Sequence, residues 1–189
     1  FREGERAAGL NLVFSGRVKI FKLAPSGKEQ ILHIMGPGEP FAEVPVFQGG
    51  RYPASAEAIE ASRVLFIPRD GLTDMIRKNP ALALDMLAVL ARRLREFAAT
   101  IESLSLRGVP ERLSAYLLHV SDQEKGAAEF ELGIKKGLLA NLLGTTGESV
   151  SRVFAKMTQA GLIRVNGKRI AILDRRALAD VAAAKRALD

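Results

Sequence analysis

The feature that most constrains the fold is a long helical pattern between residues 79 and 108. It begins at Asn79-Pro80, an N-cap residue followed by proline at the first helical position, and meets no helix breaker until Gly108. Apolar residues repeat along it every seven positions, in two registers that lie three residues apart. These residues are Leu87, Leu90, Leu94, Phe97, Ile101 and Leu104. Such spacing is typical of the a and d positions of a coiled coil.

This apolar stripe allows two interpretations. It packs either on a domain of the same chain, as in an ordinary amphipathic helix, or on the same helix of a second copy. The strict spacing of three and four residues favours the second interpretation. The sequence therefore predicts a dimerisation helix over residues 79–108 and a homodimeric protein.

The residues before this helix show the pattern of β-structure. Apolar and basic residues alternate from Arg17 to Ile20, a turn follows at 25–27, and an apolar run resumes at 31–35. Several short strands at this spacing predict a sandwich or a jelly roll (double-stranded β-helix) over residues 1–78. Because the chain begins at Phe1 without a methionine, we expect the N-terminus of this domain to be truncated.

A helix-turn-helix pattern lies between Lys136 and Val153. Ala140 is small, as required where two helices cross closely, and Gly144 suits the positive φ of a tight turn. Val150 and Val153 would bury the second helix against the first. The spacing and the residue types together predict a DNA-binding helix pair.

A basic hairpin is expected directly after the second helix. Asn166-Gly167 is the strongest short signal for a β-hairpin, and Lys168 and Arg169 follow at its expected tip. A helix-turn-helix followed by such a hairpin is a winged-helix arrangement, predicted here for residues 109–189. The expected fold class is therefore α+β, with a β jelly roll, a long helix and a C-terminal winged helix-turn-helix domain.

The candidate DNA-contacting residues share the exposed sides of the second helix, its first turn and the hairpin tip. They are Thr145, Thr146, Glu148, Ser149, Ser151, Arg152, Lys156, Lys168 and Arg169. Thr146 can cap the second helix, and Thr145 with Glu148 has capping-box spacing, so Glu148 either caps the helix or reads a base. Arg152 either forks onto guanine or pairs with Glu148. Lys168 and Arg169 are placed to contact phosphate.

The charge distribution points to a polyanionic partner. The chain has 28 Lys and Arg against 21 Asp and Glu, a formal net charge of +7. Residues 131–176 alone contain 9 basic residues against 3 acidic ones. Contacts between such residues and phosphates release condensed counterions, which favours binding to DNA; the alternative is a solvated basic face.

Composition excludes several other functions. The chain has no cysteine and only 2 histidines, which excludes disulfides, a cysteine nucleophile and iron–sulfur ligation from this chain, and disfavours a metal site. No phosphate-binding glycine loop or nucleophile elbow occurs, so we expect no enzyme. No apolar run is long enough to span a membrane and no secretory leader is visible, which predicts a cytoplasmic protein without a membrane partner.

In chain order, three motifs and the long helix resemble the CRP/FNR family of bacterial transcription regulators. The motifs are Ser15-Gly-Arg-Val-Lys-Ile20, Gly36-Pro-Gly-Glu-Pro-Phe41 and Gly144-Thr-Thr-Gly-Glu-Ser-Val-Ser-Arg152. The resemblance implies a homodimer with a cyclic-nucleotide-binding-like sensor domain and a winged-helix domain that binds double-stranded DNA. It also implies RNA polymerase as a partner and a small effector bound beneath the long helix.

Within the family, the second helix resembles the FNR-like branch. Glu148, Ser151 and Arg152 match its E-x-x-S-R pattern, which implies an inverted repeat of TTGA-like half-sites. Gly147 departs from the pattern of relatives that have a longer side chain there, so the outer base of the half-site is left open.

The effector pocket that the resemblance implies is formed by residues around the Gly36 motif and the segment after it. These are Phe41, Glu43, Val44, Arg51, Tyr52, Pro53 and Ala54. In the cyclic-AMP-binding branch an Arg-Ser pair grips the cyclic phosphate, whereas Tyr52-Pro53 occupy those positions here. Arg51 is displaced by one residue, which in a strand turns a side chain to the opposite face. A buried phosphate without a paired cation is costly, so cyclic AMP is disfavoured.

Other effectors are left open by the sequence. His33 lies in an apolar strand, where a core histidine is more common than a haem ligand. A small or apolar effector fits the pocket residues, and so does a regulator that needs no effector. The alternative function is a cyclic-nucleotide-binding regulatory module without DNA binding, which would need neither the helix-turn-helix spacing nor the basic hairpin.

Overall fold

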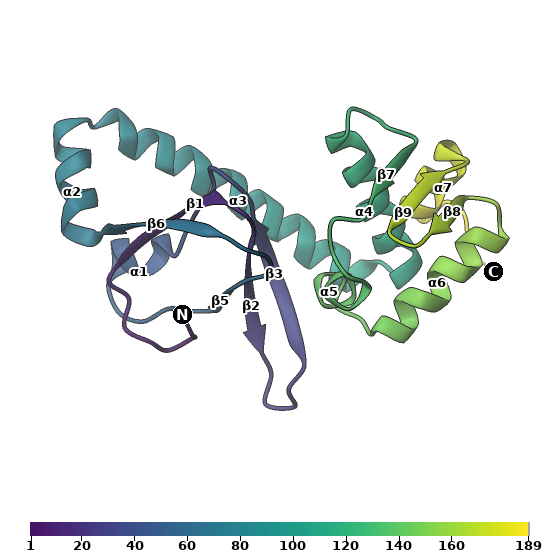
Figure 1. Cartoon of the computed structure of the whole chain (residues 1–189), viewed down its shortest axis with the longest axis horizontal. Coiled ribbons are helices and arrows are strands. Elements are labelled where there is room, and N and C mark those ends of the chain that lie inside the picture. Colours follow the sequence, from purple (N-terminus) through teal and green to yellow (C-terminus); the bar gives the residue numbers. More distant parts are fainter. Residues whose placement is uncertain (189) are drawn as a thin grey trace. The chain divides into compact units, whose positions relative to one another are not determined.

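The computed structural model describes residues 1–188, which form two compact units (Figure 1). The first unit comprises Phe1–Phe97 and the second begins at Ala98. The longest helix, α3 (Ala81–Leu106), runs across this boundary and therefore contributes residues to both units.

The first unit consists of two antiparallel three-stranded sheets. Their strand orders are β4-β1-β6 and β3-β2-β5. The strands are β1 (Gly9–Ser15), β2 (Val18–Leu23), β3 (Glu29–Met35), β4 (Pro40–Phe41), β5 (Ser55–Ala58) and β6 (Arg63–Pro68). The sheets are joined by a core that contains Val13, Val18, Met35 and Phe41. This arrangement agrees with the jelly roll expected from the sequence.

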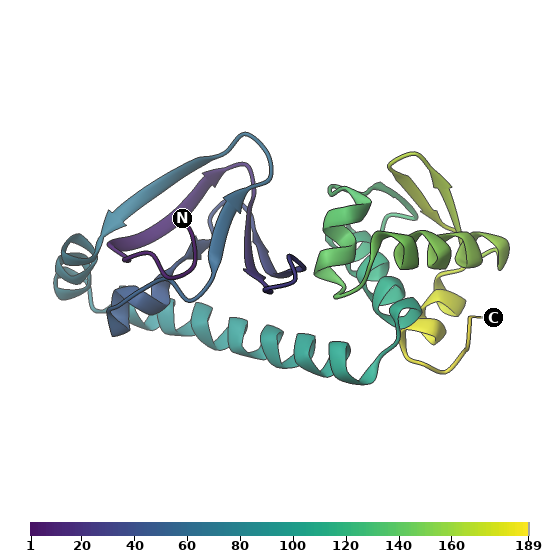
Figure 2. The same cartoon turned by 90° about the horizontal axis from the view of Figure 1, so that it is seen from below.

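Two helices in this unit were not expected from the strand-like pattern. They are α1 (Glu43–Gln48) and α2 (Arg69–Lys78). A second core, Leu10, Val46 and Leu72, packs both helices against β1. Figure 2 shows α1 beside the first turns of α3, and side chains of both line a shared groove.

The start of α3 also differs from the expectation. Asn79 is the C-cap of α2, and its backbone N–H donates to the Met75 oxygen. The Asn79 oxygen accepts from the N–H of Leu82, so this residue links the two helices, and α3 itself begins at Ala81.

The second unit contains the winged-helix arrangement. Its helices are α4 (Val109–Gln123), α5 (Lys136–Leu142), α6 (Gly147–Gln159) and α7 (Arg175–Ala182). Its sheet has the order β7-β9-β8 and consists of β7 (Glu129–Glu131), β8 (Ile163–Asn166) and β9 (Arg169–Ile172). One core of leucine, isoleucine, valine and aromatic side chains joins the helices and the sheet.

The turn between α5 and α6 has the geometry that its sequence predicts. Gly144 adopts φ 64°, and Ala140 and Val150 are buried where the two helices meet. The Thr146 side chain caps α6 by accepting from the N–H of Ser149. The expected capping box of Thr145 and Glu148 is not formed, because α6 begins one residue later than that box requires.

The wing turn is shifted by one residue from its expected place. Asn166 and Arg169 are register partners, so the two central residues are Gly167 and Lys168 rather than Asn166 and Gly167. Gly167 has φ 60°, and glycine at the first central position is the signature of a type II′ turn. Lys168 therefore occupies the tip of the hairpin, while Arg169 lies on β9.

Among residues 1–188, no helix is long and apolar enough to cross a membrane.

Replacing glycine by alanine should have opposite effects in the turn between α5 and α6 and within α5. Gly144→Ala places a Cβ in the left-handed region, which costs about 1–2 kcal/mol of stability. Gly137→Ala in α5 meets no atom within 4 Å and should stabilise by about 0.5–1 kcal/mol. Urea unfolding followed by circular dichroism measures both changes. Destabilisation by both variants would show that packing around α5, rather than the φ of Gly144, causes the loss of stability.

Candidate functional site

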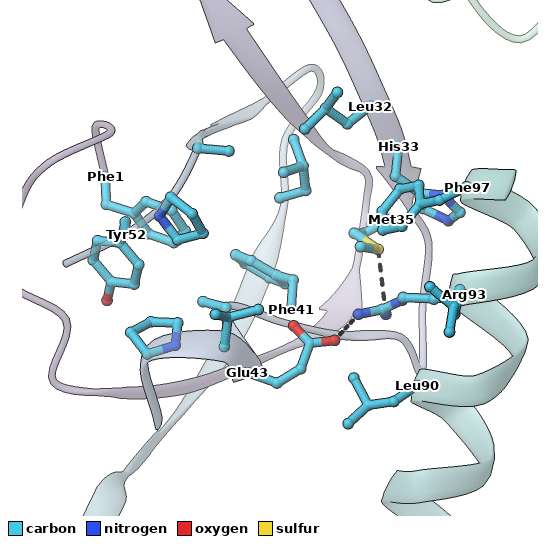
Figure 3. A pocket seen from close by; sticks show the side chains of 17 residues that line it. Phe1, Leu32, His33, Met35, Phe41, Glu43, Tyr52, Leu90, Arg93 and Phe97 are labelled. Atoms are coloured by element: carbon cyan, nitrogen blue, oxygen red, sulfur yellow. Dashed lines mark hydrogen bonds and ion pairs between the residues drawn. The ribbon is translucent and has the colours of Figure 1, made fainter. Parts of the chain in front are cut away.

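The first unit encloses a mainly apolar cavity of about 330 Å³ between the strands, α1 and α3 (Figure 3). Six of the residues expected in the effector pocket line it, namely Phe41, Glu43, Val44, Tyr52, Pro53 and Ala54. Further walls come from strand residues such as Met35 and His33, and from α3. The cavity thus lies between the segments 41–45 and 52–54 on one side and α3 on the other.

Arg51 does not line this cavity, which corrects the sequence expectation. Its Nη1 donates to the Gly4 oxygen over 2.7 Å, and the side chain lies on a different hollow. The neighbouring Tyr52 is buried and lines the cavity. Arg51 therefore lies outside the cavity that Tyr52, Pro53 and Ala54 line.

An ion pair that the sequence did not reveal lies in the cavity wall. Arg93 of α3 pairs through Nη1 with Oε1 of Glu43, and each side chain is only 9% exposed. Nη2 of Arg93 donates to the Pro40 oxygen and lies 3.6 Å from the Met35 sulfur. Figure 3 shows the Arg93 guanidinium reaching from the helix to the Glu43 carboxylate. α3 is thereby anchored to the β-domain by a buried ion pair.

Neighbouring groups shift the pKa values of Arg93 and Glu39. Burial lowers the pKa of Arg93, while the carboxylates of Glu39 and Glu96 oppose that shift. Glu39 lies 3.8 Å from Nε2 of His33 and accepts a 2.6 Å hydrogen bond from the N–H of Gly36. The hydrogen bond from His33 is the main reason why the pKa of Glu39 is lowered. The imidazole of His33 is therefore engaged at the cavity wall by a carboxylate.

Aromatic side chains form the opposite end of the cavity. The rings of Phe1 and Tyr52 stack with centroids 3.7 Å apart and planes inclined by 10°. Figure 3 shows both rings at the end away from Arg93. A ligand in this space would meet aromatic faces on one side and an already neutralised ion pair on the other.

The two registers of the seam pattern differ in exposure. Leu87, Leu94 and Ile101 are 58%, 71% and 65% exposed, whereas Phe97 is 38% exposed and Leu90 is half-buried. Leu90 and Phe97 line the cavity, and so does Leu94 of the more exposed register. Leu104, the last residue of the expected seam, is half-buried. Leu84, which the sequence analysis did not include, is 69% exposed. We define the outer stripe of α3 as Leu84, Leu87, Leu94 and Ile101.

Helix α6 has one buried face and one solvent face. Val150, Val153, Phe154 and Met157 are buried in the core of the second unit. The candidate DNA-contacting residues of α6 lie on the other sides: Glu148, Ser151, Arg152 and Lys156 are exposed, and Ser149 is half-buried.

The polar contacts of α6 leave these side chains available. Arg152 Nη2 lies 3.4 Å from Ser149 Oγ, and within residues 1–188 no carboxylate pairs with Arg152. The alternative in which Glu148 neutralises Arg152 is therefore absent from the structure. Thr145 is half-buried and Thr146 is exposed at the start of the helix.

Basic side chains continue around this surface. Lys168 and Arg169 are exposed on the wing, and Arg169 is the register partner of Glu131 on β7. Lys136, at the start of α5, lies 5.3 Å above the ring of Phe154. The sequence analysis did not single out Lys136, although its place before the first helix of the pair was a usable signal.

Comparison with known proteins agrees with this architecture. The cyclic nucleotide-binding domain family matches residues 1–79, and the Crp-like helix-turn-helix domain family matches residues 111–181. A CRP-like cAMP-activated global transcriptional regulator of Mycobacterium tuberculosis is 36% identical over 183 residues, covering 95% of this chain and 82% of the relative. The chain belongs to the CRP/FNR family of transcription regulators.

Two further members show how the family resemblance extends over the chain. The cyclic AMP receptor protein of Thermus thermophilus is 33% identical, covering 96% of this chain and 83% of the relative. The structure of FixK2 from Bradyrhizobium japonicum superimposes with a TM-score of 0.83 at 26% identity, covering 96% and 90% of the two chains. The expected fold class and the expected role as a DNA-binding transcription regulator, rather than an enzyme, are confirmed.

The buried ion pair should show strong coupling between its partners. Arg93→Ala or Glu43→Ala leaves one buried charge unpaired and should lower stability by about 3–5 kcal/mol. The double variant Glu43→Ala with Arg93→Ala removes both charges and should lose less than the sum of the two single changes. Arg95→Ala, on the exposed side of α3, is the control and should stay within about 0.5 kcal/mol. Strict additivity in urea unfolding would contradict the pairing.

Proposed function

We propose that this CRP/FNR regulator reads an inverted repeat of TTGA-like half-sites as a homodimer and responds to a small apolar effector. The proposed DNA reading rests on the environment of Arg152. This residue lies on the exposed face of α6 and has no carboxylate partner among the described residues. An arginine so placed can fork onto the O6 and N7 atoms of guanine. Glu148 and Ser151 share this exposed face and complete the reading surface.

The remaining basic residues would position the protein on the duplex. Lys168 at the wing tip, Arg169 on β9, Lys136 at the start of α5 and Lys156 on α6 are available for phosphate contacts. Contacts of this type fix register and orientation but carry no sequence information. Because the second helix of each subunit enters a major groove, the two half-site centres would lie roughly 34 Å apart.

The outer stripe of α3 supports the dimer. Four large apolar side chains on one helix face are exposed to solvent, at an energetic cost that pairing with a second copy would remove. The heptad spacing of Leu87, Leu94 and Ile101 places them along a single seam. Leu90 and Phe97 are less exposed and line the cavity, so we assign them to the effector site; Leu94 borders both surfaces.

The chemistry of the cavity favours an apolar effector over a cyclic nucleotide. The relatives from Mycobacterium tuberculosis and Thermus thermophilus are named for cyclic AMP, which makes it the second candidate. The one guanidinium in the cavity wall, that of Arg93, is already held by Glu43 and the Pro40 oxygen. A cyclic phosphate would have to break this buried pair, whereas an apolar molecule would fill the space beside Tyr52 and leave the pair intact.

The proposed control acts through α3. An effector in contact with Leu90 and Phe97 changes how α3 packs on its own β-domain. Because the outer stripe lies on the same turns of α3, this change also affects the surface that pairs with the second copy. Only one arrangement of the paired helices would match both half-sites, so the effector raises DNA affinity by favouring that arrangement. We further propose RNA polymerase as a partner and the cytoplasm as the compartment, since both follow from regulation of bacterial transcription.

Two substitutions should separate base reading from phosphate contact. Arg152→Ala should cost about 1–3 kcal/mol of binding free energy and relax the preference at one base pair. Lys168→Ala should weaken binding to all duplexes alike and reduce the salt slope by about one. Fluorescence anisotropy with a TTGA inverted repeat and a scrambled duplex, at two salt concentrations, measures both. Equal loss on the two duplexes for Arg152→Ala would refute direct reading by this residue.

The dimer seam is tested by placing lysine on the outer stripe. Leu94→Lys with Ile101→Lys should give a monomer, because two buried charges in each helix would face each other across the seam. Ala99→Lys, exposed on another side of α3, should remain dimeric. Sedimentation equilibrium distinguishes the two states. A dimeric double variant would show that the stripe is not the interface.

A further inference from the structure

A second hollow in the first unit has a chemistry opposite to that of the apolar cavity. It has a volume of about 420 Å³ and is lined by Arg6, Arg51 and Arg69 together with small residues of two loops. Among the described residues, no aspartate or glutamate belongs to its lining. Three exposed arginines therefore border one open space without a carboxylate among them.

The backbone brings two of these arginines together. Arg6 and Arg51 are paired in an isolated antiparallel bridge, and directly opposite residues of such a pair project to the same side. Like charges in this position repel, so the bridge alone would favour a different residue at one of the two sites. Hydrogen bonds between Ala7 and Gly50 and between Tyr52 and Glu5 hold the two segments in this register.

The third arginine comes from a separate element. Arg69 is the first residue of α2, where the helix dipole adds positive potential, and no side chain caps this end. Its Nη1 lies 3.7 Å from the position that a Cβ on Gly49 would occupy, so the guanidinium extends over the loop after α1. A Cβ on Gly50 would meet no atom within 4 Å, which leaves bare backbone facing open space.

Some arginines of the unit have a carboxylate partner: Arg17 pairs with Glu60, Arg77 with Asp74, and Arg93 with Glu43. Within the described residues, none of the hollow's three arginines forms an ion pair, and Arg51 donates only to the Gly4 oxygen. An external anion would supply the missing negative charge.

We propose that this hollow is a binding site for a small polyvalent oxyanion, either a diphosphate-type or a tricarboxylate-type molecule. Arginine forks match the oxygens of both groups, and three cations match an anion of about three charges. The site is separate from the effector cavity, although Pro45 of α1 lines both spaces. The inference goes beyond the proposed function, because DNA binding and an apolar effector require no anion here.

The experiment is isothermal titration calorimetry of the full chain in a chloride buffer without phosphate or sulfate. Pyrophosphate and citrate are the two probes, and acetate is the monovalent control. We expect one pyrophosphate or citrate per chain, with acetate at least about tenfold weaker because it engages fewer guanidinium groups. The tighter of the two polyanions identifies the type of oxyanion. Binding of neither polyanion, or equal binding of acetate, overturns the proposal.

Substitutions place the binding in the hollow. Arg6→Ala and Arg69→Ala should each weaken the bound polyanion about tenfold, the effect of losing one charged hydrogen-bonding group. Arg51→Lys keeps the positive charge and the fold near Gly4 but loses the paired N–H donors of the guanidinium, so it should also weaken binding. Arg95→Ala on α3 and Lys168→Ala on the DNA-binding surface are matched controls, and both should bind as the parent does. Unchanged binding in the three hollow variants, or loss in Lys168→Ala, would place the anion elsewhere and refute the site.

Discussion

The buried ion pair between Arg93 and Glu43 is the contact on which the sensor unit depends. It is the charged link between α3 and the β-domain, and it closes one end of the apolar cavity. A buried pair of this kind adds little net stability over apolar residues of equal size, but the loss of either partner is severe. Its role is therefore geometric: it joins α3 to the cavity wall, next to the apolar contact that Leu82 and Met86 of the same helix make with the second core of the unit.

The heptad pattern of α3 meets two environments. Leu90 and Phe97 line the cavity, Leu87 and Ile101 are exposed to solvent, and Leu94 lines the cavity while remaining largely exposed. The sequence could indicate that every one of these positions is apolar, but a seven-residue period is compatible with more than one partner surface. Which register meets which partner depends on the tertiary fold, and the contact of Arg93 with Glu43 belongs to that fold and has no periodic signal in the sequence.

Elements defined by local backbone requirements were predicted most accurately. Gly144, Ala140 and Thr146 identify the turn and the start of α6, because the positive φ, the close helix approach and the cap each demand a particular residue type. The wing was predicted from its Asn-Gly signal but shifted by one residue, since Gly167 can serve as either central residue of a tight turn. α1 was missed because its single turn and a half, with Pro45 inside, carries no helical period; α2 was missed because it lies between a strand and the longer helix.

The two hollows of the first unit differ in chemistry although neighbouring residues line them. Tyr52 closes the apolar cavity, while Arg51 joins a cluster of arginines. The sequence analysis counted Arg51 among the pocket residues. In the structure it lies at the other hollow, and among the described residues the one guanidinium lining the cavity, that of Arg93, is paired with Glu43. The cavity is thus suited to molecules that carry no charge, whereas the hollow lined by arginines is suited to an anion.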